Sequence, residues 1–240
     1  MIILQISSRL WECMHAKRRY TALILVNAIY FKSFWVTKFM YHKTFSGSFF
    51  VSQNEEIKVN MMHQTNDFKY FESKELACQV LEMPYIDQKM SMVIYCPKEI
   101  NGLAELEEKM TYDNLEKSFS LLDASMGKVE VFLPKFQLTQ QFDLSDILSK
   151  MGAEEMCIPG KADLSGITAK PLFVSKVAQK AFVKVNEEET EAAAVAVEYL
   201  AKCVTESQWI FKADHPFLFL IRHNDSGSIL FMGRLMKPVS

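Results

Sequence analysis

The chain has 240 residues, of which 49% are hydrophobic and 23% are charged, and its formal net charge at pH 7 is −2. This composition is ordinary for a soluble globular protein, and the small net charge argues against nucleic acid or an acidic membrane surface as a partner. No apolar run is long enough to span a bilayer, and residues 1–4 are too short for the core of a signal peptide.

The first predicted element is a strand over residues 23–31. This run is almost continuously apolar, which is typical of a strand that is covered on both faces. Asn27 interrupts it. A buried amide is destabilising unless it is hydrogen-bonded, so we expect Asn27 to have a polar partner.

A hairpin and two helices are predicted next. Residues 79–85 and 90–96 have the pattern of two strands joined by a short polar turn. A short helical stripe follows over residues 103–110, and Thr111 is well placed to cap a second helix that carries Leu115 and Phe119.

Two more local patterns precede the last third of the chain. Residues 128–133 alternate apolar with charged or bulky side chains, which predicts a half-buried strand that Pro134 ends. Apolar residues with helical spacing over 144–151 predict a helix that ends at Gly152.

The strand predicted over residues 173–185 has one apolar face and one lysine-bearing face. Gln179 falls on the apolar face, where it is a plausible partner for Asn27. We therefore expect the two strands to share a sheet, with the two amides close to each other. The apolar face comprises Val177, Ala181, Val183 and Val185.

An acidic stretch, residues 187–191, leads into the alanine-rich residues 192–197. Local propensity alone predicts a helix for the alanines, and a mobile loop is the alternative. Residues 216–221 and 228–235 then form a predicted hairpin near the C-terminus.

The sequence contains no recognisable catalytic or metal-binding motif. The five histidines lack the spacing of a ligand set, and the odd number and wide spacing of the five cysteines fit neither a disulfide framework nor a zinc site. His215 is expected in a turn. Cys203 is interpreted as a loop cysteine rather than the nucleophile of a thiol enzyme, because no basic or glycine-rich context would lower its pKa. No metal or cofactor is expected, and the thiols indicate a cytosol-like compartment.

Six segments, in this order, resemble the serpin family and specifically its ovalbumin-like intracellular branch. The resemblance covers residues 21–238 and leaves residues 1–20 as an unmatched N-terminal segment. It implies a single partial serpin domain over residues 21–240, of the α+β class, with mixed sheets, short helices and a reactive loop at about 188–212. The segments are residues 25–32 with Trp35, 81–85 with 91–94, 133–136, 162–167, 185–188, and 213–219 with 233–235.

The resemblance implies a peptidase inhibitor and not an enzyme, with a serine peptidase, or alternatively a cysteine peptidase, as partner. The loop acts as bait, and its cleavage lets it insert as a new strand in the large sheet. Family spacing puts the bait bond at Cys203-Val204, with Lys202-Cys203 as the alternative. A non-inhibitory interaction protein, or a truncated and non-functional isoform, is the alternative function. Export by an unconventional route is the alternative to a cytoplasmic location.

The same resemblance assigns roles around the inserting segment. Small side chains suit insertion between two strands, but Glu189 stands where this branch usually has glycine, which would slow insertion. Gln179 stands where the family usually has histidine; with Asn27 and Trp35 it is assigned to the shutter and breach beneath the loop. The expected hinge comprises Glu187, Glu189, Thr190, Glu191, Ala192, Ala193, Ala194, Val195 and Ala196.

The N-terminal helices and further sheet strands of the family have no counterpart in the sequence. The strand over residues 23–31 would then lack a neighbour on one side and expose an apolar edge. We therefore expect poor folding of the isolated chain, or self-association through this edge.

Overall fold

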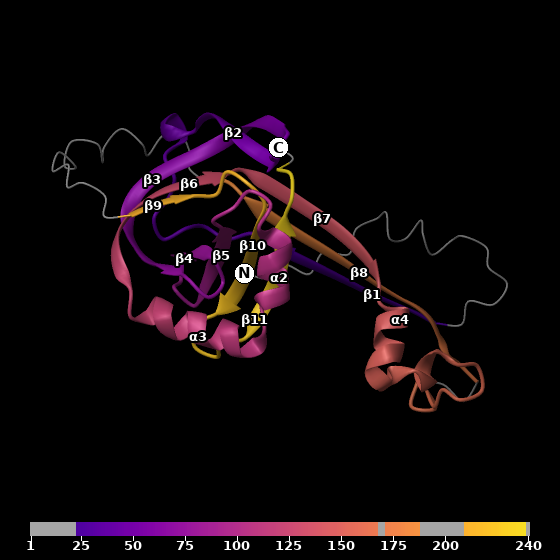
Figure 1. Ribbon diagram of the computed structural model, residues 1–240. Helices are drawn as coiled ribbons and strands as arrows, with labels where there is room; N and C mark the ends of the chain where they lie inside the picture. Colours follow the sequence, from indigo (N-terminus) through magenta and orange to yellow (C-terminus); the bar gives the residue numbers. More distant parts are fainter. Residues whose placement is uncertain (1–22, 168–170, 188–208, 239–240) are drawn as a thin grey trace. The chain divides into compact units, whose positions relative to one another are not determined.

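The computed structural model describes residues 23–167, 171–187 and 209–238. These residues form two compact units. One unit comprises residues 23–32 and 137–184, and the other comprises residues 33–136 and the described residues from 185 onwards. Figure 1 shows the elements of both units in sequence colours.

The smaller unit is built on a three-stranded sheet in the order β1-β8-β7. Its strands are β1 (Leu23–Phe31), β8 (Val174–Val185) and β7 (Phe136–Asp143). After β7 the chain forms α4 (Ser145–Leu148) and the short turns η2 (Ser149–Ala153) and η3 (Glu155–Cys157). Gly152 has a φ of 99°, a left-handed conformation that glycine adopts without strain, and it interrupts the helix as predicted.

The strands β1 and β8 are parallel, and Asn27 lies directly opposite Gln179 in their register. The two strands therefore share a sheet, as predicted. The predicted burial of β1 is wrong, because Asn27 and its neighbours Leu25 and Val26 are exposed. Among the described strands β1 pairs with β8 alone, so its outer side has no partner strand to cover it.

The predicted apolar face of β8 is only partly buried. Val183 and Val185 are buried, whereas Val177 and Ala181 are half-buried. The lysine face begins as expected with a partly exposed Lys176. The alternation of apolar and lysine residues thus identified the strand and its two faces, but it overestimated how far the apolar face is buried.

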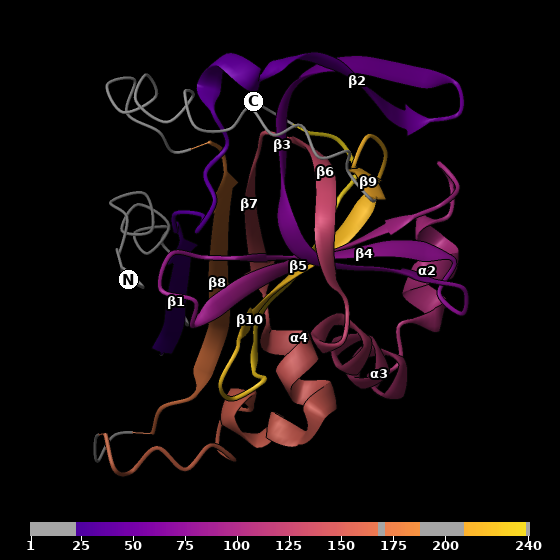
Figure 2. The ribbon, with the colours of Figure 1, turned by 90° about the vertical axis from the view of Figure 1, so that its left-hand side faces the viewer.

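The larger unit is built on an eight-stranded sheet in the order β11-β10-β5-β4-β3-β6-β9, with β2 paired to β3 (Figures 1 and 2). All of its pairs are antiparallel except β6 with β9. The strands are β2 (Phe45–Ser52), β3 (Glu55–Ser73), β4 (Cys78–Pro84), β5 (Met90–Pro97), β6 (Met126–Pro134), β9 (Trp209–Lys212), β10 (Phe217–His223) and β11 (Ile229–Leu235).

Three short helices belong to this unit: η1 (Tyr41–Lys43), α2 (Leu103–Lys109) and α3 (Tyr112–Asp123). Thr111 caps α3 as predicted, because its hydroxyl accepts a hydrogen bond from the backbone N–H of Asn114 at 3.3 Å. The buried faces of α2 and α3 pack with β4, β5 and β10 in one apolar cluster that includes Leu106, Phe119 and Leu220.

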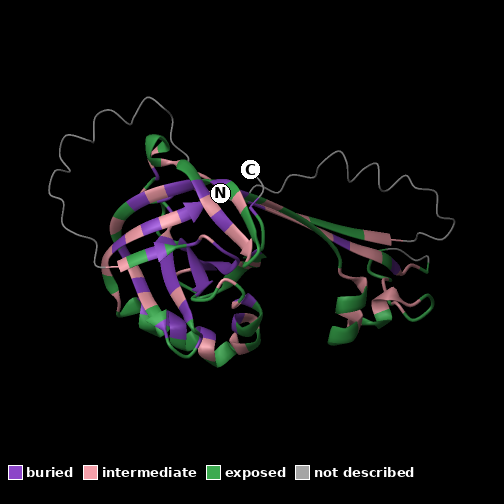
Figure 3. Cartoon of the chain, turned by 45° about the horizontal axis from the view of Figure 1, so that its top comes forward, coloured by how far each residue is buried: buried purple, intermediate pink, exposed green. Residues whose placement is uncertain are grey.

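Both predicted hairpins are confirmed, as β4 with β5 and β10 with β11. Every residue of β5 is buried, and Figure 3 shows the burial of each element. Gly233 on β11 allows a close approach: a Cβ there would lie 2.8 Å from the ring of Phe219 on β10. Any larger residue there would force the Phe219 ring to move.

No strand was predicted over β3, which is the longest of the described strands. Its apolar residues alternate with Lys58, Asn60 and other polar side chains, so no continuous apolar run marks it. The strand pairs with β2, β4 and β6 along its length and therefore occupies the middle of the sheet. The mixed sheets with few short helices confirm the α+β class.

Candidate functional site

The first candidate site lies where the chain leaves β8 and enters residues 188–208. Glu187 follows the strand by two positions, and only 4% of its surface is exposed. The hydroxyl of Thr44 donates to Oε1 of Glu187 at 2.6 Å, and Nζ of Lys135 lies 2.8 Å from Oε2. Both oxygens of this buried carboxylate are therefore paired, as a buried charge requires.

The electrostatics of Glu187 follow from these contacts. Burial by itself raises the pKa of the carboxyl, but the hydrogen bonds from Lys135 and Thr44 outweigh it, and the pKa lies below its ordinary value. The Lys135 ammonium also lies 5.6 Å from the centre of the Tyr41 ring. Glu187 is thus a charged anchor at neutral pH.

Trp35 fixes the residue immediately before this anchor. Its indole N–H donates to the carbonyl of Asn186 at 3.1 Å. The ring is buried and stacks on Tyr85 with a centroid separation of 4.6 Å and an interplanar angle of 13°. The backbone on either side of Trp35 also bonds to the end of the β4–β5 hairpin, so the indole has little freedom to move.

The second candidate site lies where the chain returns at β9. This strand pairs with β6, and the N–H of Ala213 continues the contact by donating to the carbonyl of Phe132 at 2.9 Å. The carbonyl of Asp214 then accepts from the N–H of Phe50 at 2.8 Å. Hydrogen bonds to two different strands thus hold the chain directly after β9.

His215 lies in this bend, as predicted, but it is also buried. Its Nδ1 lies 2.9 Å from Oδ1 of Asp214, and its Nε2 lies 2.7 Å from the carbonyl oxygen of Pro97. Burial alone would raise the pKa of Asp214, but hydrogen bonds from His215 and Lys212 hold it below its ordinary value. Hydrogen bonds through His215 therefore link this bend to the end of β5.

The amides assigned to the shutter lie in the other unit. Asn27 and Gln179 face each other across β1 and β8, yet within the described residues no hydrogen bond joins them. Asn27 is exposed and Gln179 is half-buried. In the described chain, water can satisfy both amides.

Most of the predicted hinge lies outside the described residues, namely Glu189–Ala196 as a group. Lys202, Cys203 and Val204 lie outside them too, so the bait bond and the thiol alternative stay predictions. The sequence analysis gave no role to Thr44, Lys135 or Tyr41. A buried carboxylate needs hydrogen-bond donors or a cation, but the burial of Glu187 is not visible in the local sequence, and spacing does not select its partner among 27 lysines and arginines.

The described part of the chain has neither of two features that would suggest another chemistry. Within the residues shown in ribbon form, no helix is long and apolar enough to cross a membrane. The same part of the chain holds no group of three or more His, Cys, Asp or Glu side chains that could bind a metal ion.

Comparison with known proteins identifies a family for this arrangement. The family model described as "Serpin (serine protease inhibitor)" matches residues 12–238 and so begins inside the segment that the sequence analysis left unmatched. The leukocyte elastase inhibitor of Homo sapiens is 42% identical over 223 residues, which are 91% of this chain and 59% of that protein. Serpin B11 of Homo sapiens is 38% identical, over 91% of this chain and 56% of that protein.

Solved structures show the same likeness. Uncleaved ovalbumin matches with a TM-score of 0.78 and 31% identity, over 91% of this chain and 55% of ovalbumin. Human thyroxine-binding globulin, solved with its ligand, matches with a TM-score of 0.81 and 34% identity, over 94% of this chain and 59% of that protein. The chain spans about 59% of the length of the first curated relatives it matches.

The relatives agree with the ovalbumin-like branch that the six sequence segments indicate. The family model extends over almost the whole chain. Both candidate sites, the Glu187 anchor and the second anchor at the bend after β9, lie within the region it matches. The chain therefore belongs to the serpin family.

Proposed function

We propose that this protein inhibits serine peptidases as a suicide substrate, by insertion of a cleaved loop into the sheet that contains β1 and β8. The observation that carries the proposal is the attachment of residues 188–208. They begin at the buried Glu187 anchor and end at β9, which is part of a different sheet. Relatives of this chain are named for the inhibition of leukocyte elastase, a function that supports the proposal.

The direction of the strands suits insertion. A segment that follows β8 and folds back would run antiparallel to β8, and therefore antiparallel to β1 as well. Insertion would replace one parallel ladder by two antiparallel ladders, which are slightly more stable per residue. The new strand would also bury side chains that β1 and β8 now leave half-exposed.

Cleavage at Cys203-Val204 would divide the loop unequally. The part that carries Thr190 and the alanines would stay joined to β8, whereas the part after the cut would stay joined to β9. Small hinge side chains lower the barrier to entry between two strands. A peptidase still acylated on the first part would be carried with it, which is the trapping step of the mechanism.

The test mixes the purified protein with a panel of serine and cysteine peptidases and looks for covalent complexes on a denaturing gel. We expect a complex with at least one serine peptidase. Ala194→Glu places a charge in the inserting hinge and should turn inhibition into simple cleavage. Ala104→Glu, at an exposed site on α2, is the matched control and should leave complex formation intact.

The outcome that contradicts this proposal is loop cleavage by every reactive peptidase without any complex and without a gain in thermal stability. That result would favour the second candidate, a non-inhibitory interaction protein of the serpin family. Glu189 favours this second candidate, because a charged residue that resists the backbone angles of glycine would slow the hinge. Glu189→Gly should then restore complex formation if slow insertion is the cause.

We also propose that the protein acts in a reducing compartment such as the cytosol. The described cysteines Cys78, Cys96 and Cys157 are all free thiols. Burial raises the pKa of Cys78 to about 12, and it also raises the pKa of Cys96. Free thiols suit a reducing compartment such as the cytosol. Fractionation of cells that express the full protein would test this location against export.

A further inference from the structure

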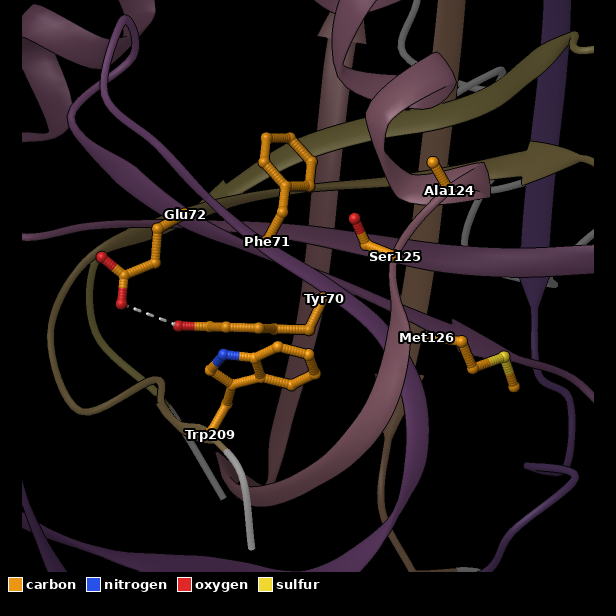
Figure 4. Close-up of a pocket in the computed structure, with 7 residues that line it drawn as sticks. All are labelled: Tyr70, Phe71, Glu72, Ala124, Ser125, Met126 and Trp209. Carbon is orange, nitrogen blue, oxygen red and sulfur yellow. Dashed lines mark hydrogen bonds between the residues drawn. The ribbon is translucent and has the colours of Figure 1, made fainter.

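An open pocket of about 490 Å³ lies beside the point where the chain returns into β9 (Figure 4). It is formed by the end of β3, the turn between α3 and β6, and the first residue of β9. Five of its seven lining side chains are apolar. The lining residues are Tyr70, Phe71, Glu72, Ala124, Ser125, Met126 and Trp209.

Two aromatic rings form one wall of this pocket. Tyr70 is buried, and its ring lies over that of Trp209 with a centroid distance of 5.4 Å and an interplanar angle of 36°. The Tyr70 hydroxyl donates to Oε1 of Glu72 at 3.2 Å and accepts from Nε2 of Gln79 at 2.9 Å. The single proton of this hydroxyl is therefore used, and it has no donor left for a ligand.

The carboxylate of Glu72 is the charged group at the pocket. Its side chain is 47% exposed, and Nζ of Lys98 lies 2.5 Å from Oε2. The hydrogen bond from Lys98 lowers the pKa of Glu72, so the carboxylate is ionised at neutral pH. The pocket thus combines aromatic and aliphatic walls with one half-exposed carboxylate that Lys98 already pairs, so an incoming cation would compete with Lys98.

The chain places this pocket close to the proposed bait bond. Val204 precedes Trp209 by five positions, and five residues span at most about 18 Å. A peptidase interface of ordinary size covers roughly 800 Å² per partner, which is a patch of about 16 Å radius. The largest possible separation therefore exceeds this radius by only about 2 Å, so a peptidase that is bound at Cys203-Val204 would have its rim close to Trp209.

We propose that this pocket is an accessory docking site for a basic side chain, arginine or lysine, on the surface of the target peptidase. The proposal rests on the proposed function, because the peptidase is the partner of the same loop. The aliphatic stem would pack against Trp209 and Met126, and the cation would pair with Glu72. Apolar walls with one placed charge suit such an amphipathic side chain better than an anionic or purely apolar one.

The test measures the binding of a peptidase whose nucleophile is replaced by alanine, so that docking is seen without cleavage. We expect Glu72→Gln to raise the dissociation constant by roughly 3- to 10-fold. Lys98→Met removes the competing cation and should lower the dissociation constant. The matched control is Glu75→Gln, because Glu75 is similarly exposed at 52% and is also paired with a lysine, and it should change nothing.

The opposite effects expected for the Glu72 and Lys98 variants distinguish a docking role of Glu72 from a purely structural role of its ion pair with Lys98. Both variants break the same ion pair, so a structural role would weaken binding in both. Weaker binding with Lys98→Met, or no change with Glu72→Gln, would overturn the proposal. Loss of binding with Trp209→Ala while Glu72→Gln has no effect would show an apolar occupant and would also overturn it.

A parallel assay of covalent complexes with active peptidase separates this proposal from the proposed function. If the Glu72→Gln variant forms covalent complexes at the same rate as the parent protein, only the proposed docking site is contradicted. If docking depends on Glu72 but no covalent complex forms, only the proposed inhibition by loop insertion is contradicted. The failure of every inactive peptidase in the panel to bind would overturn the docking site directly.

Discussion

The two units of this protein differ sharply in how much apolar surface they bury. Of the buried hydrophobic residues in the described chain, only Phe31, Val174, Ala178 and Val183 belong to the smaller unit. The larger unit holds all the others, including an entirely buried β5. Burial of apolar surface is the main source of stability in a folded domain. The unit built on the eight-stranded sheet thus contains nearly all of the buried apolar core of the described chain.

This difference suits the proposed mechanism. A sheet that must accept another strand has to exchange its present contacts for new ones, and β1 and β8 have few buried contacts to lose. The anchors at Glu187 and at β9 belong to the well-packed unit. We infer that the rigid unit holds the loop at both ends while the sparsely buried sheet provides the place for insertion.

The largest expected effect is the loss of a core side chain in the eight-stranded sheet. Leu220 on β10 is 1% exposed and packs in the cluster beneath α2 and α3. Leu220→Ala should lower the free energy of unfolding by about 2–5 kcal/mol, through lost burial and the cavity left behind. Urea denaturation followed by circular dichroism measures this loss.

The matched change in the smaller unit is Leu25→Ala on β1. Leu25 is 42% exposed, so the same chemical truncation should change the free energy of unfolding by no more than about 0.5 kcal/mol. Equal losses for the two variants would contradict the comparison between the units. They would mean that β1 is buried in the protein in solution.

The second prediction concerns the anchor that joins the loop to the rigid unit. Glu187→Gln should lower the free energy of unfolding by about 1–3 kcal/mol, because Lys135 then loses its buried partner. Lys135→Met should cost a similar amount, and the double variant less than the sum of the two losses. The four free energies form a double-mutant cycle that is measured by urea denaturation.

An exposed ion pair on α2 gives the reference for this cycle. Lys109 and Glu105 are 2.6 Å apart at positions i and i+4, with side chains that are 40% and 65% exposed. Their coupling should stay below about 0.5 kcal/mol. Additive losses at Glu187 and Lys135, with a coupling no larger than this reference, would show that Glu187 is not an anchor.

Much of the larger unit was predictable from local patterns in the sequence. The hairpin of β4 and β5, the cap at Thr111 and the C-terminal hairpin all depend on contacts between residues close in the chain. The anchor depends on contacts across long distances instead: Thr44 and Glu187 are 143 positions apart. Only the resemblance to serpins marked Glu187 as important, and no local rule selects its partners.

The burial of β1, in contrast, was predicted from the sequence and is wrong. Its apolar run was correctly assigned to a strand, but hydrophobicity reports what a strand would bury rather than what actually covers it. The pocket beside Trp209 was not predicted either. Three separated segments form it, and none of them carries a motif.

The third prediction is a dependence of stability on pH that comes from the two anchors. Burial raises the pKa of Glu187 and of Asp214, but the hydrogen bonds from their partners outweigh it, so both pKa values are lowered in the folded protein. A lowered folded pKa gives stability that is present above the unfolded value, near 4.5 for Glu187, and that is lost as the pH falls through the folded pKa. The melting temperature should therefore fall between pH 5 and roughly pH 3.

Single substitutions show which carboxyl groups cause the fall in melting temperature at low pH. Glu187→Gln should have a lower melting temperature at pH 7 and a smaller fall on acidification, because the glutamine does not titrate. The fall that remains should shrink further with Asp214→Asn. Glu105→Gln removes an exposed carboxylate and should leave the pH profile close to that of the parent protein. A profile that is identical for Glu187→Gln and the parent would rule out Glu187 as a source.

The smallest effect on stability is expected at the edge of the sparsely buried sheet. Val26 on β1 is 38% exposed, and among the described strands β1 pairs only with β8. Val26→Lys should change the free energy of unfolding by less than about 0.5 kcal/mol, yet it should reduce self-association, because a charged edge resists pairing with another strand. Sedimentation velocity over a range of concentrations measures the association.

The matched control is Ile86→Lys, at a residue that is 60% exposed and lies in the turn between β4 and β5. It adds the same charge to the well-packed unit but leaves every strand edge unchanged. If the two lysine variants reduce association equally, net charge rather than strand pairing governs it. If only Val26→Lys reduces association, strand pairing at the outer edge of β1 governs it. That edge lies on the side of β1 away from β8, so a second chain could pair there without blocking entry of the cleaved loop between β1 and β8.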